Sequence, residues 1–331
     1  MASRERSTPS ITTTANTMRS PMLALLIYPL TLFVGSLFSV LSPTAQGIRS
    51  SSQASPSPMT PSLASSVHLS PPSPVNYFAR KDNIFNLYFV KVGWLWTTIA
   101  FASLLVSQPA YTSPSTHQPR RLAQALLRYA LATAAWYLTT QWFFGPAIID
   151  RGFVVTGGKC EEILRETPVE VVEREGSVSR GLERLFTAAA CKAAGGVWAG
   201  GHDVSGHVFM LVLATSMLVF EAFGAVRRGG FGARGGEKKQ DGDGDGEGER
   251  EGDEQAEKEG EEGGVMGVWS LRFVAGVVGL GWWMLFMTSI WFHTWLEKWS
   301  GLLIALGTIY VVYILPLGAP AWRDTVGIPG V

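Results

Sequence analysis

Two short polar segments in an otherwise apolar sequence carry the residue types that acid–base or nucleophilic chemistry needs. The first contains His207, and the second contains His293. A histidine titrates near neutral pH and can act as an acid or a base, and a neutral imidazole can act as a nucleophile toward phosphorus. Each segment lies where a long apolar run meets polar sequence. This pattern predicts phosphate chemistry at a membrane surface.

The residues around these histidines also suit an anion. Asp203 or Ser205 can cap a helix that begins here, and Gly206 lets the backbone approach a ligand closely. Glu297 lies four residues after His293, so in a helical turn it could hold the other ring nitrogen. The alternative is that each histidine is an interfacial residue satisfied by water, and the residues alone leave this open.

A metal site is the other possibility that these residues raise. His202 and Asp203 lie beside His207, but the spacing of five residues between the two histidines suits neither successive helical turns nor a known zinc pattern. The acidic run that begins at Asp241 matches the opening of an EF-hand loop, but its twelfth position is Gly252. The sequence therefore predicts no metal and no other cofactor.

The elements that must position these residues are membrane helices. Of the 331 residues, 47% are hydrophobic and 12 are tryptophan, and the mean hydropathy is +0.17. Runs of roughly 20 mostly apolar residues have the length that crosses the hydrocarbon core as a helix. These runs lie at about 22–41, 90–107, 122–144, 204–226, 266–290 and 299–317. We therefore expect an all-α polytopic membrane protein with about six transmembrane helices.

The segments outside the runs differ sharply from them in composition. The first run is longer than the apolar region of a signal peptide and is predicted to be an uncleaved signal anchor. A Ser/Thr-rich head, a Ser/Pro-rich segment and an acidic Gly-rich segment cannot bury a core, so we expect them to be disordered. These three segments are residues 1–21, 42–75 and 227–264.

The number of spans decides which polar segments share a side of the membrane. Six spans place both termini on one side, and basic residues near the span ends weakly favour the cytosol for them. The acidic segment and the tail at 318–331 are then cytosolic, whereas residues 42–75, the loop at 145–203 and the turn near 291–298 are lumenal. His207 and His293 thus fall on the lumenal side, at the ends of consecutive spans, where they could form one site.

The only two cysteines, Cys160 and Cys191, both belong to the 145–203 loop. In an oxidising lumen they could pair and close a loop of about 30 residues. Two unrelated thiols remain the alternative, because spacing cannot show whether the Cα atoms approach closely enough.

Several strings, in the same order along the chain, resemble those of the fat storage-inducing transmembrane (FIT) family. They are Tyr28-Pro29, Gly35-Ser36-Leu37-Phe38-Ser39, the segment from Asn86 to Trp94, Gly195-Gly196-Val197-Trp198, Gly200-Gly201-His202-Asp203-Val204-Ser205-Gly206-His207, and Phe292-His293-Thr294 with Glu297-Lys298. The resemblance implies a multi-pass protein of the endoplasmic reticulum membrane with cytosolic termini. It also implies a helical core like that of the lipid phosphate phosphatases.

The resemblance further implies an activity and roles for the site residues. The activity is cleavage of fatty acyl-CoA to acyl 4′-phosphopantetheine and adenosine 3′,5′-bisphosphate, in support of lipid droplet formation and lipid homeostasis. His207 matches the acid that protonates the leaving group, and His293 matches the nucleophile that forms a phosphohistidine. Ser205 and Gly206 help to hold the phosphate. Residue type and position, rather than the resemblance, add Asp203, Glu297 and Lys298 as supporting residues.

The chain departs from the wider lipid phosphatase pattern in its cations. That pattern has an arginine six residues before the nucleophilic histidine, where this chain has Met287. The counter-charges of the phosphate are therefore unassigned, and Lys298, Lys192 and Arg151 are only on the expected side.

The expected partners are fatty acyl-CoA and membrane lipids, neutral lipids included, and no nucleic acid. The alternative function is a noncatalytic scaffold that binds neutral lipids, such as triacylglycerol or diacylglycerol, within the bilayer.

Overall fold

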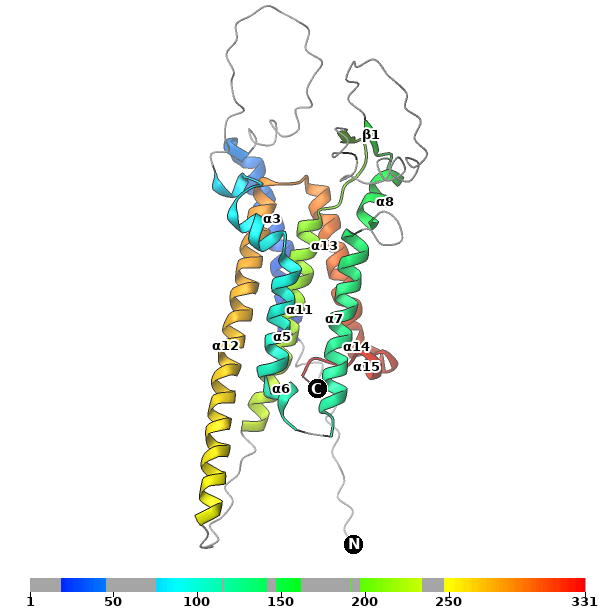
Figure 1. Cartoon of the computed structure of the whole chain (residues 1–331). Helices are drawn as coiled ribbons and strands as arrows, with labels where there is room; N and C mark the ends of the chain where they lie inside the picture. Colours follow the sequence, from blue (N-terminus) through cyan, green and yellow to red (C-terminus); the bar gives the residue numbers. More distant parts are fainter. Residues whose placement is uncertain are drawn as a thin grey trace, which may run out of the picture.

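The computed structural model describes residues 19–45, 76–114, 116–141, 147–161, 191, 197–233 and 247–330. Long helices run side by side in an elongated bundle, with a small sheet and α8 at one end and the C-terminus toward the other (Figure 1). The long helices are α3 (Ile27–Leu41), α5 (Gly93–Ser107), α7 (Gln118–Thr140), α11 (Gly206–Ala233), α12 (Glu247–Trp291) and α13 (Trp295–Ile309).

Shorter elements join or flank these helices. They are α2 (Arg19–Ala24), α6 (Pro109–Thr112), α8 (Ile148–Val155), α14 (Leu315–Gly318), α15 (Pro320–Val326), the 3₁₀ turn η1 (Tyr77–Ala79), the π-helical turns η2 (Asn86–Val90) and η3 (Tyr310–Ile314), and strands β1 (Lys159–Glu161) and β2 (Val197–Ala199). The strands pair antiparallel in one two-stranded sheet.

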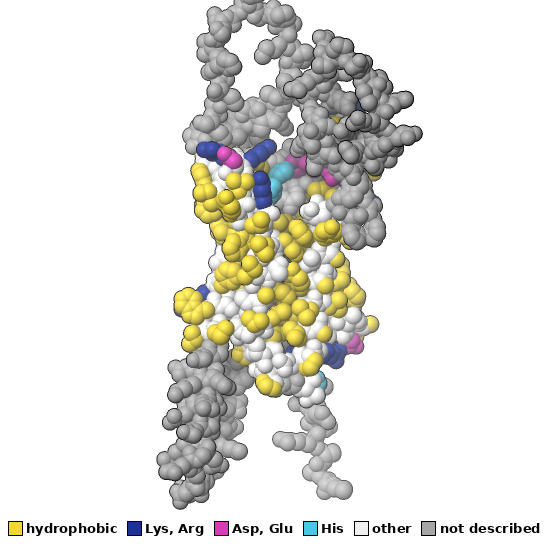
Figure 2. All heavy atoms as spheres, in the orientation of Figure 1, with side chains coloured by type: hydrophobic (Ala, Val, Ile, Leu, Met, Phe, Trp, Pro, Cys, Tyr) yellow, Lys and Arg dark blue, Asp and Glu magenta, His cyan; other side chains and the backbone are white. Residues whose placement is uncertain are grey.

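The prediction of a helical polytopic membrane protein is confirmed. Within the described residues, four stretches are long and apolar enough to cross a membrane: Met22–Leu41, Gly206–Arg227, Val265–Trp291 and Trp295–Gly318. The other two expected spans coincide with α7 and with the shorter apolar helix α5. Figure 2 shows a band of hydrophobic side chains between two ends at which charged side chains gather. A total of six spans remains a prediction.

Helix α11 forms the centre of the bundle. It is the most buried of the four apolar stretches, and it packs against α5, α7, α12 and α13. A helix that is apolar on all sides suits this position, because most of its surface meets other helices rather than lipid. The outer faces of α3, α12 and α13 leave apolar side chains exposed, as expected where a helix contacts lipid.

Helix α3 belongs to the same core. Tyr28 is buried, and its hydroxyl lies 2.9 Å from the Thr215 hydroxyl of α11. Ser39 donates a hydrogen bond of 2.5 Å to the Ile290 carbonyl of α12. Such contacts between small polar side chains hold membrane helices close together. The first apolar run is therefore part of the bundle, while its being an uncleaved signal anchor remains a prediction.

A buried ion pair joins α7 to α11 at the end opposite the sheet. Arg128 Nε lies 2.6 Å from Glu221 Oε1, and neither side chain is exposed by more than 1%. Tyr111 and Tyr313 donate hydrogen bonds to the same carboxylate. The guanidinium also donates to the Val326 carbonyl, at 3.0 Å. This network satisfies both charges and ties the C-terminal segment to the bundle.

The acidic segment expected to be disordered over 227–264 is partly helical. Helix α11 continues to Ala233, and α12 begins at Glu247, well before its apolar part. That part of the prediction is wrong, because Glu, Gln, Ala and Lys favour helix strongly enough to extend one that the span has already nucleated. The rest of that segment, most of the head and residues 46–75 lie outside the described residues.

Candidate functional site

The two histidines singled out in the sequence meet at one end of the bundle. His207 lies in the first turn of α11, and His293 lies in the short turn between α12 and α13. Their ring centroids are 6.4 Å apart, and the ring planes are inclined at 49°. Both side chains are half-buried. The structure thus brings together two residues that the sequence separates by 86 positions (293 minus 207).

The backbone of His293 has an unusual conformation. Its φ is +61°, and it is the one non-glycine residue with a positive φ in the part of the chain that the structure describes. Residues with a side chain rarely adopt this left-handed region, and holding one there costs about 1 kcal/mol or more. The sharp turn lets α12 end and α13 begin within a few residues, with the imidazole at the turn.

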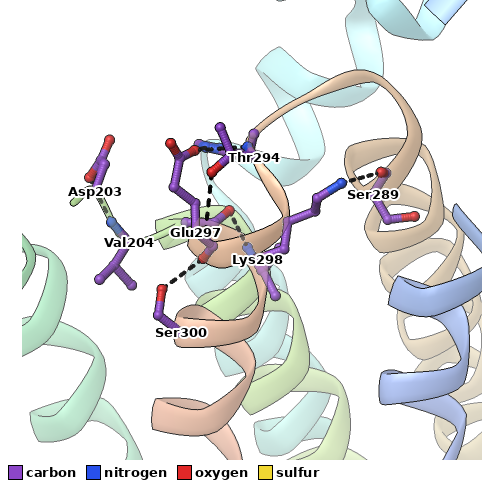
Figure 3. Close-up of polar contacts among 10 residues, drawn as sticks. Asp203, Val204, Ser289, Thr294, Glu297, Lys298 and Ser300 are labelled. Carbon is purple, nitrogen blue, oxygen red and sulfur yellow. Dashed lines mark hydrogen bonds and ion pairs between the residues drawn. The ribbon is translucent and has the colours of Figure 1, made fainter. Parts of the chain in front are cut away.

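The first turn of α13 fixes the orientation of the His293 ring. Thr294 and Glu297 form a capping box, in which Glu297 Oε2 accepts from the Thr294 N–H at 3.2 Å. The same oxygen lies 2.9 Å from His293 Nδ1. An ionised carboxylate can only accept, so Nδ1 carries a proton, and in the neutral imidazole Nε2 then keeps its lone pair. Figure 3 shows Glu297 turned back over Thr294 at the start of this helix.

Ser205 joins the start of α11 to the start of α13. Its N–H donates to the Glu297 carbonyl at 3.0 Å, and its hydroxyl accepts from the Val208 N–H at 3.4 Å. A Cβ added at Gly301 would lie 2.7 Å from the Ser205 carbonyl oxygen, so the two helices touch backbone to backbone here. Ser205 is fully buried and acts as a helix cap. Its hydroxyl accepts this one hydrogen bond and keeps its own proton as a donor.

Gly206 and the first N–H groups of α11 face the remaining space. A helix cannot pair its first N–H groups internally, and together with the helix dipole they attract an anion. A Cβ at Gly206 would have only two side-chain carbons at about 4 Å, from Ile149 and Thr140. The start of α11 is therefore open enough for a phosphate oxygen to approach.

Two of the supporting residues make local contacts. Asp203 Oδ1 accepts from the N–H of the next residue, Val204, at 2.8 Å. Lys298 is only 1% exposed, and its ammonium donates to the Ser289 carbonyl at 2.6 Å. Figure 3 shows this lysine reaching back to the end of α12. Lys298 therefore ties α13 to α12 and does not reach the open face of the site.

A disulfide lies in the loop that leads into the site. Cys160 and Cys191 are bonded, with their Cα atoms 5.7 Å apart. Cys160 lies in β1, opposite Trp198 of β2. The chain then continues from β2 toward α11, so the disulfide and the sheet together hold the segment that ends at His207.

The connection from β2 to α11 also rests on α8. The His202 N–H donates to the Thr156 hydroxyl at 2.7 Å, and a Cβ at Gly201 would collide with the Phe153 carbonyl oxygen. Among the described residues, no group of three or more His, Cys, Asp or Glu could hold a metal ion. His202 thus contributes a backbone contact that positions the segment.

Sequence reasoning missed Thr294, although its signal was present. A Thr followed three residues later by Glu, before an apolar run, is the signature of a capping box. Of the three cations considered, Lys298 is buried against α12, Arg151 is exposed on α8, and Lys192 lies outside the described residues.

Comparison of the sequence with known proteins identifies the family of this chain. The model of the family described as fat storage-inducing transmembrane protein (FIT) matches residues 74–313. Acyl-coenzyme A diphosphatase fit1 of Schizosaccharomyces pombe is 29% identical over 262 residues, which are 79% of this chain and 82% of the relative. No solved structure matches the chain.

Two other relatives match shorter stretches. Acyl-coenzyme A diphosphatase SCS3 of Saccharomyces cerevisiae is 26% identical, over 43% of this chain and 56% of its own length. Acyl-coenzyme A diphosphatase FITM2 of Homo sapiens is 29% identical, over 45% of this chain and 48% of its own length. The chain thus spans about half the length of these two relatives.

Proposed function

Because the chain belongs to the fat storage-inducing transmembrane protein family, we propose that it is a membrane hydrolase that cleaves the diphosphate of fatty acyl-CoA. The products are acyl 4′-phosphopantetheine and adenosine 3′,5′-bisphosphate, and the activity supports lipid droplet formation and lipid homeostasis. The observation that carries this proposal is the pair of imidazoles 6.4 Å apart, one of them held by Glu297.

The spacing of the two rings suits a phosphoryl group between them. A reacting atom in a near-attack position, or a hydrogen-bonded heavy atom, lies about 3 Å from its partner. Each ring nitrogen lies about 1 Å from its ring centroid, so centroids 6.4 Å apart leave about 4 Å or more between the nearest nitrogens, beyond the roughly 3.2 Å limit of a hydrogen bond. One phosphate can thus contact both histidines, whereas the rings are too far apart to bond to each other.

In the first step, the Nε2 lone pair of His293 attacks one phosphorus of the diphosphate, and the P–O bond of the anhydride breaks. The departing oxygen takes a proton from His207. The phosphorylated His293 ring is positively charged, and the Glu297 carboxylate at Nδ1 stabilises that charge. This step assigns the nucleophile to His293 and the acid to His207.

In the second step, water attacks the phosphohistidine, and His207 accepts a proton from that water. The P–N bond breaks and His293 regains its lone pair. The sum of both steps is one water added across the anhydride, so neither histidine is consumed and no cofactor is needed.

We also propose that the site faces the lumen of the endoplasmic reticulum. The disulfide between Cys160 and Cys191 lies at the same end as the histidines, and disulfides persist in oxidising compartments. Protease treatment of sealed microsomes tests the orientation. A tag inserted between residues 162 and 190 should be protected, and a tag at the C-terminus should be cleaved.

The test of the activity is hydrolysis of oleoyl-CoA by the purified protein, with the products identified by mass spectrometry. His293→Ala should abolish hydrolysis. His117→Ala is the matched control and should hydrolyse normally, because this exposed histidine precedes α7 at the opposite end of the bundle (Figure 1). Full hydrolysis by the His293→Ala variant would refute the proposed mechanism.

An apolar cavity favours a second candidate function, lipid binding without catalysis. The cavity has a volume of about 340 Å³ and lies among α3, α11 and α12. Tyr28, Phe220 and Trp282 are among its lining residues. Under this alternative, radiolabelled triacylglycerol or diacylglycerol would bind the purified protein equally well before and after His293→Ala, and oleoyl-CoA would stay intact with both.

A further inference from the structure

The proposed reaction requires a cation that the histidine pair does not supply. A diphosphate is anionic throughout the reaction, and its nearest fixed charge on α13 is the carboxylate of Glu297. Sites that transfer phosphoryl groups offset such charge with lysine, arginine or a metal ion. Lys298 is buried against the Ser289 carbonyl, and Arg80 forms an ion pair of 2.9 Å with Asp82. Neither of these two residues is available to offset the charge of the diphosphate.

The start of α5 lies against the start of α11, beside His207. A Cβ added at Gly93 would lie 2.7 Å from Met210 Cε, so these two helices pack closely at this end. Met210 follows His207 by three residues, which places both side chains on one face of α11. The residues just before Gly93 therefore lie at the same level of the bundle as the first turn of α11, which carries His207.

Lys91 precedes Gly93 by two residues, so it lies at the end of α5 that packs against the first turns of α11. Figure 2 shows basic side chains next to histidine side chains at this end of the bundle. The side chain of Lys91 is exposed, and its ammonium makes no hydrogen bond or ion pair with any residue that the structure describes. Lys91 is therefore available to a ligand that approaches His207.

The backbone before Lys91 is also unusual. The π-helical turn η2 ends at Val90, and the Lys91 N–H donates to the Asn86 carbonyl at 2.9 Å to close it. A π turn inserts one residue into a helix and redirects the side chains that follow, and such turns occur frequently at functional sites. In this chain the turn lies directly before Lys91.

We propose that Lys91 binds the substrate diphosphate beside His207 and offsets the negative charge that develops as the anhydride breaks. This role rests on the proposed function, because it assigns a ligand to the same site. The ligand is the diphosphate of an acyl-CoA, whose oxygens reach the ammonium from the exposed side of the two histidines.

Kinetics with oleoyl-CoA test this role. Lys91→Ala and Lys91→Gln should each lower kcat/KM about 100-fold, since removing one donor to transition-state charge costs about 10² to 10³ in rate and Lys91 is exposed. Lys91→Arg should retain at least a tenth of the activity. Lys81→Ala is the matched control, an exposed lysine at the same end, and should stay within about twofold of the parent protein. Unchanged kcat/KM in Lys91→Ala and Lys91→Gln would overturn the proposal.

A binding measurement separates this inference from the proposed function. In the His293→Ala background, which cannot turn over, CoA binding is measured by titration calorimetry with and without Lys91→Gln. An affinity at least tenfold weaker with Lys91→Gln supports the role of Lys91 even if the protein hydrolyses no acyl-CoA. Equal affinity for CoA in the two proteins overturns it, even if hydrolysis by the parent protein is demonstrated.

Discussion

Replacing Glu297 with glutamine should slow hydrolysis strongly while leaving the fold intact. The carboxylate fixes the His293 proton on Nδ1, through a contact of 2.9 Å. An amide has nearly the same shape but carries no charge, and it can present either its oxygen or its NH₂ group. When the NH₂ group faces Nδ1, the ring proton moves to Nε2 and blocks the nucleophile.

The expected size of this effect follows from the type of hydrogen bond that is lost. Hydrogen bonds to charged groups contribute about 1.5 to 3 kcal/mol, and about 1.4 kcal/mol corresponds to a factor of ten in rate. The side chains of His293 and Glu297 are 24% and 20% exposed, so water screens the contact only in part. We therefore expect kcat to fall about 10- to 150-fold.

Thr294→Ala provides the matched control. It removes the hydroxyl that accepts from the Glu297 N–H at 3.4 Å but keeps the carboxylate next to His293. Losing a helix cap costs about 0.5 to 2 kcal/mol, so thermal unfolding in detergent should occur at lower temperature. The kcat of the folded fraction should stay within about threefold. The reasoning is refuted if Glu297→Gln turns over oleoyl-CoA within twofold of the parent protein, or if Thr294→Ala loses as much kcat.

Two further predictions concern helix packing. Gly301→Ala should lower both thermal stability and hydrolysis, because its Cβ would press on the Ser205 carbonyl oxygen and overpacking costs about 1 to 3 kcal/mol. Gly307→Ala is the control and should change neither, because a Cβ there has no neighbour within 4 Å. Equal behaviour of the two variants in the thermal and activity assays would contradict the geometry. Arg128→Met should lower the free energy of unfolding by about 3 to 5 kcal/mol, because it leaves Glu221 buried and unpaired. Adding Glu221→Met should recover most of that loss in thermal unfolding. A double variant less stable than the single variant would argue against the ion pair.

The sequence was sufficient to bring the two histidines together. Runs of about 20 apolar residues predict spans, and counting spans predicts which polar segments share a side. His207 and His293 lie at the ends of consecutive spans, and consecutive helices are usually neighbours. Their meeting in the structure follows from those two rules, without any knowledge of how the helices are rotated.

The cations could not be assigned in the same way. Whether a lysine faces a site depends on the rotation of its helix and on the path of its side chain, and sequence spacing fixes neither. Lys298 lies one residue after Glu297, yet it points into the bundle. Lys91 is more than 100 residues from either histidine, and only the close packing of Gly93 against Met210 reveals it.

The ion pair of Arg128 and Glu221 could not be predicted from the sequence either. The two residues are 93 positions apart and lie within apolar runs, where sequence gives no rule for pairing charges. Membrane proteins keep such residues only when they have partners. The order of spans favours α7 and α11 as neighbours by the same rule, but their pairing also depends on the rotation and relative height of the two helices, which sequence spacing does not specify.

The joint between Ser205 and Glu297 has a consequence for biosynthesis. The residues that hold His207 in place include the Glu297 carbonyl and Gly301, which are made long after the start of α11. A ribosome that has completed α12 has produced one histidine of the pair but neither the other nor the helix that orients it. The nascent chain therefore holds no competent catalyst until its last membrane helices have been translated and inserted. Under the proposed mechanism, an incomplete nascent chain cannot hydrolyse acyl-CoA.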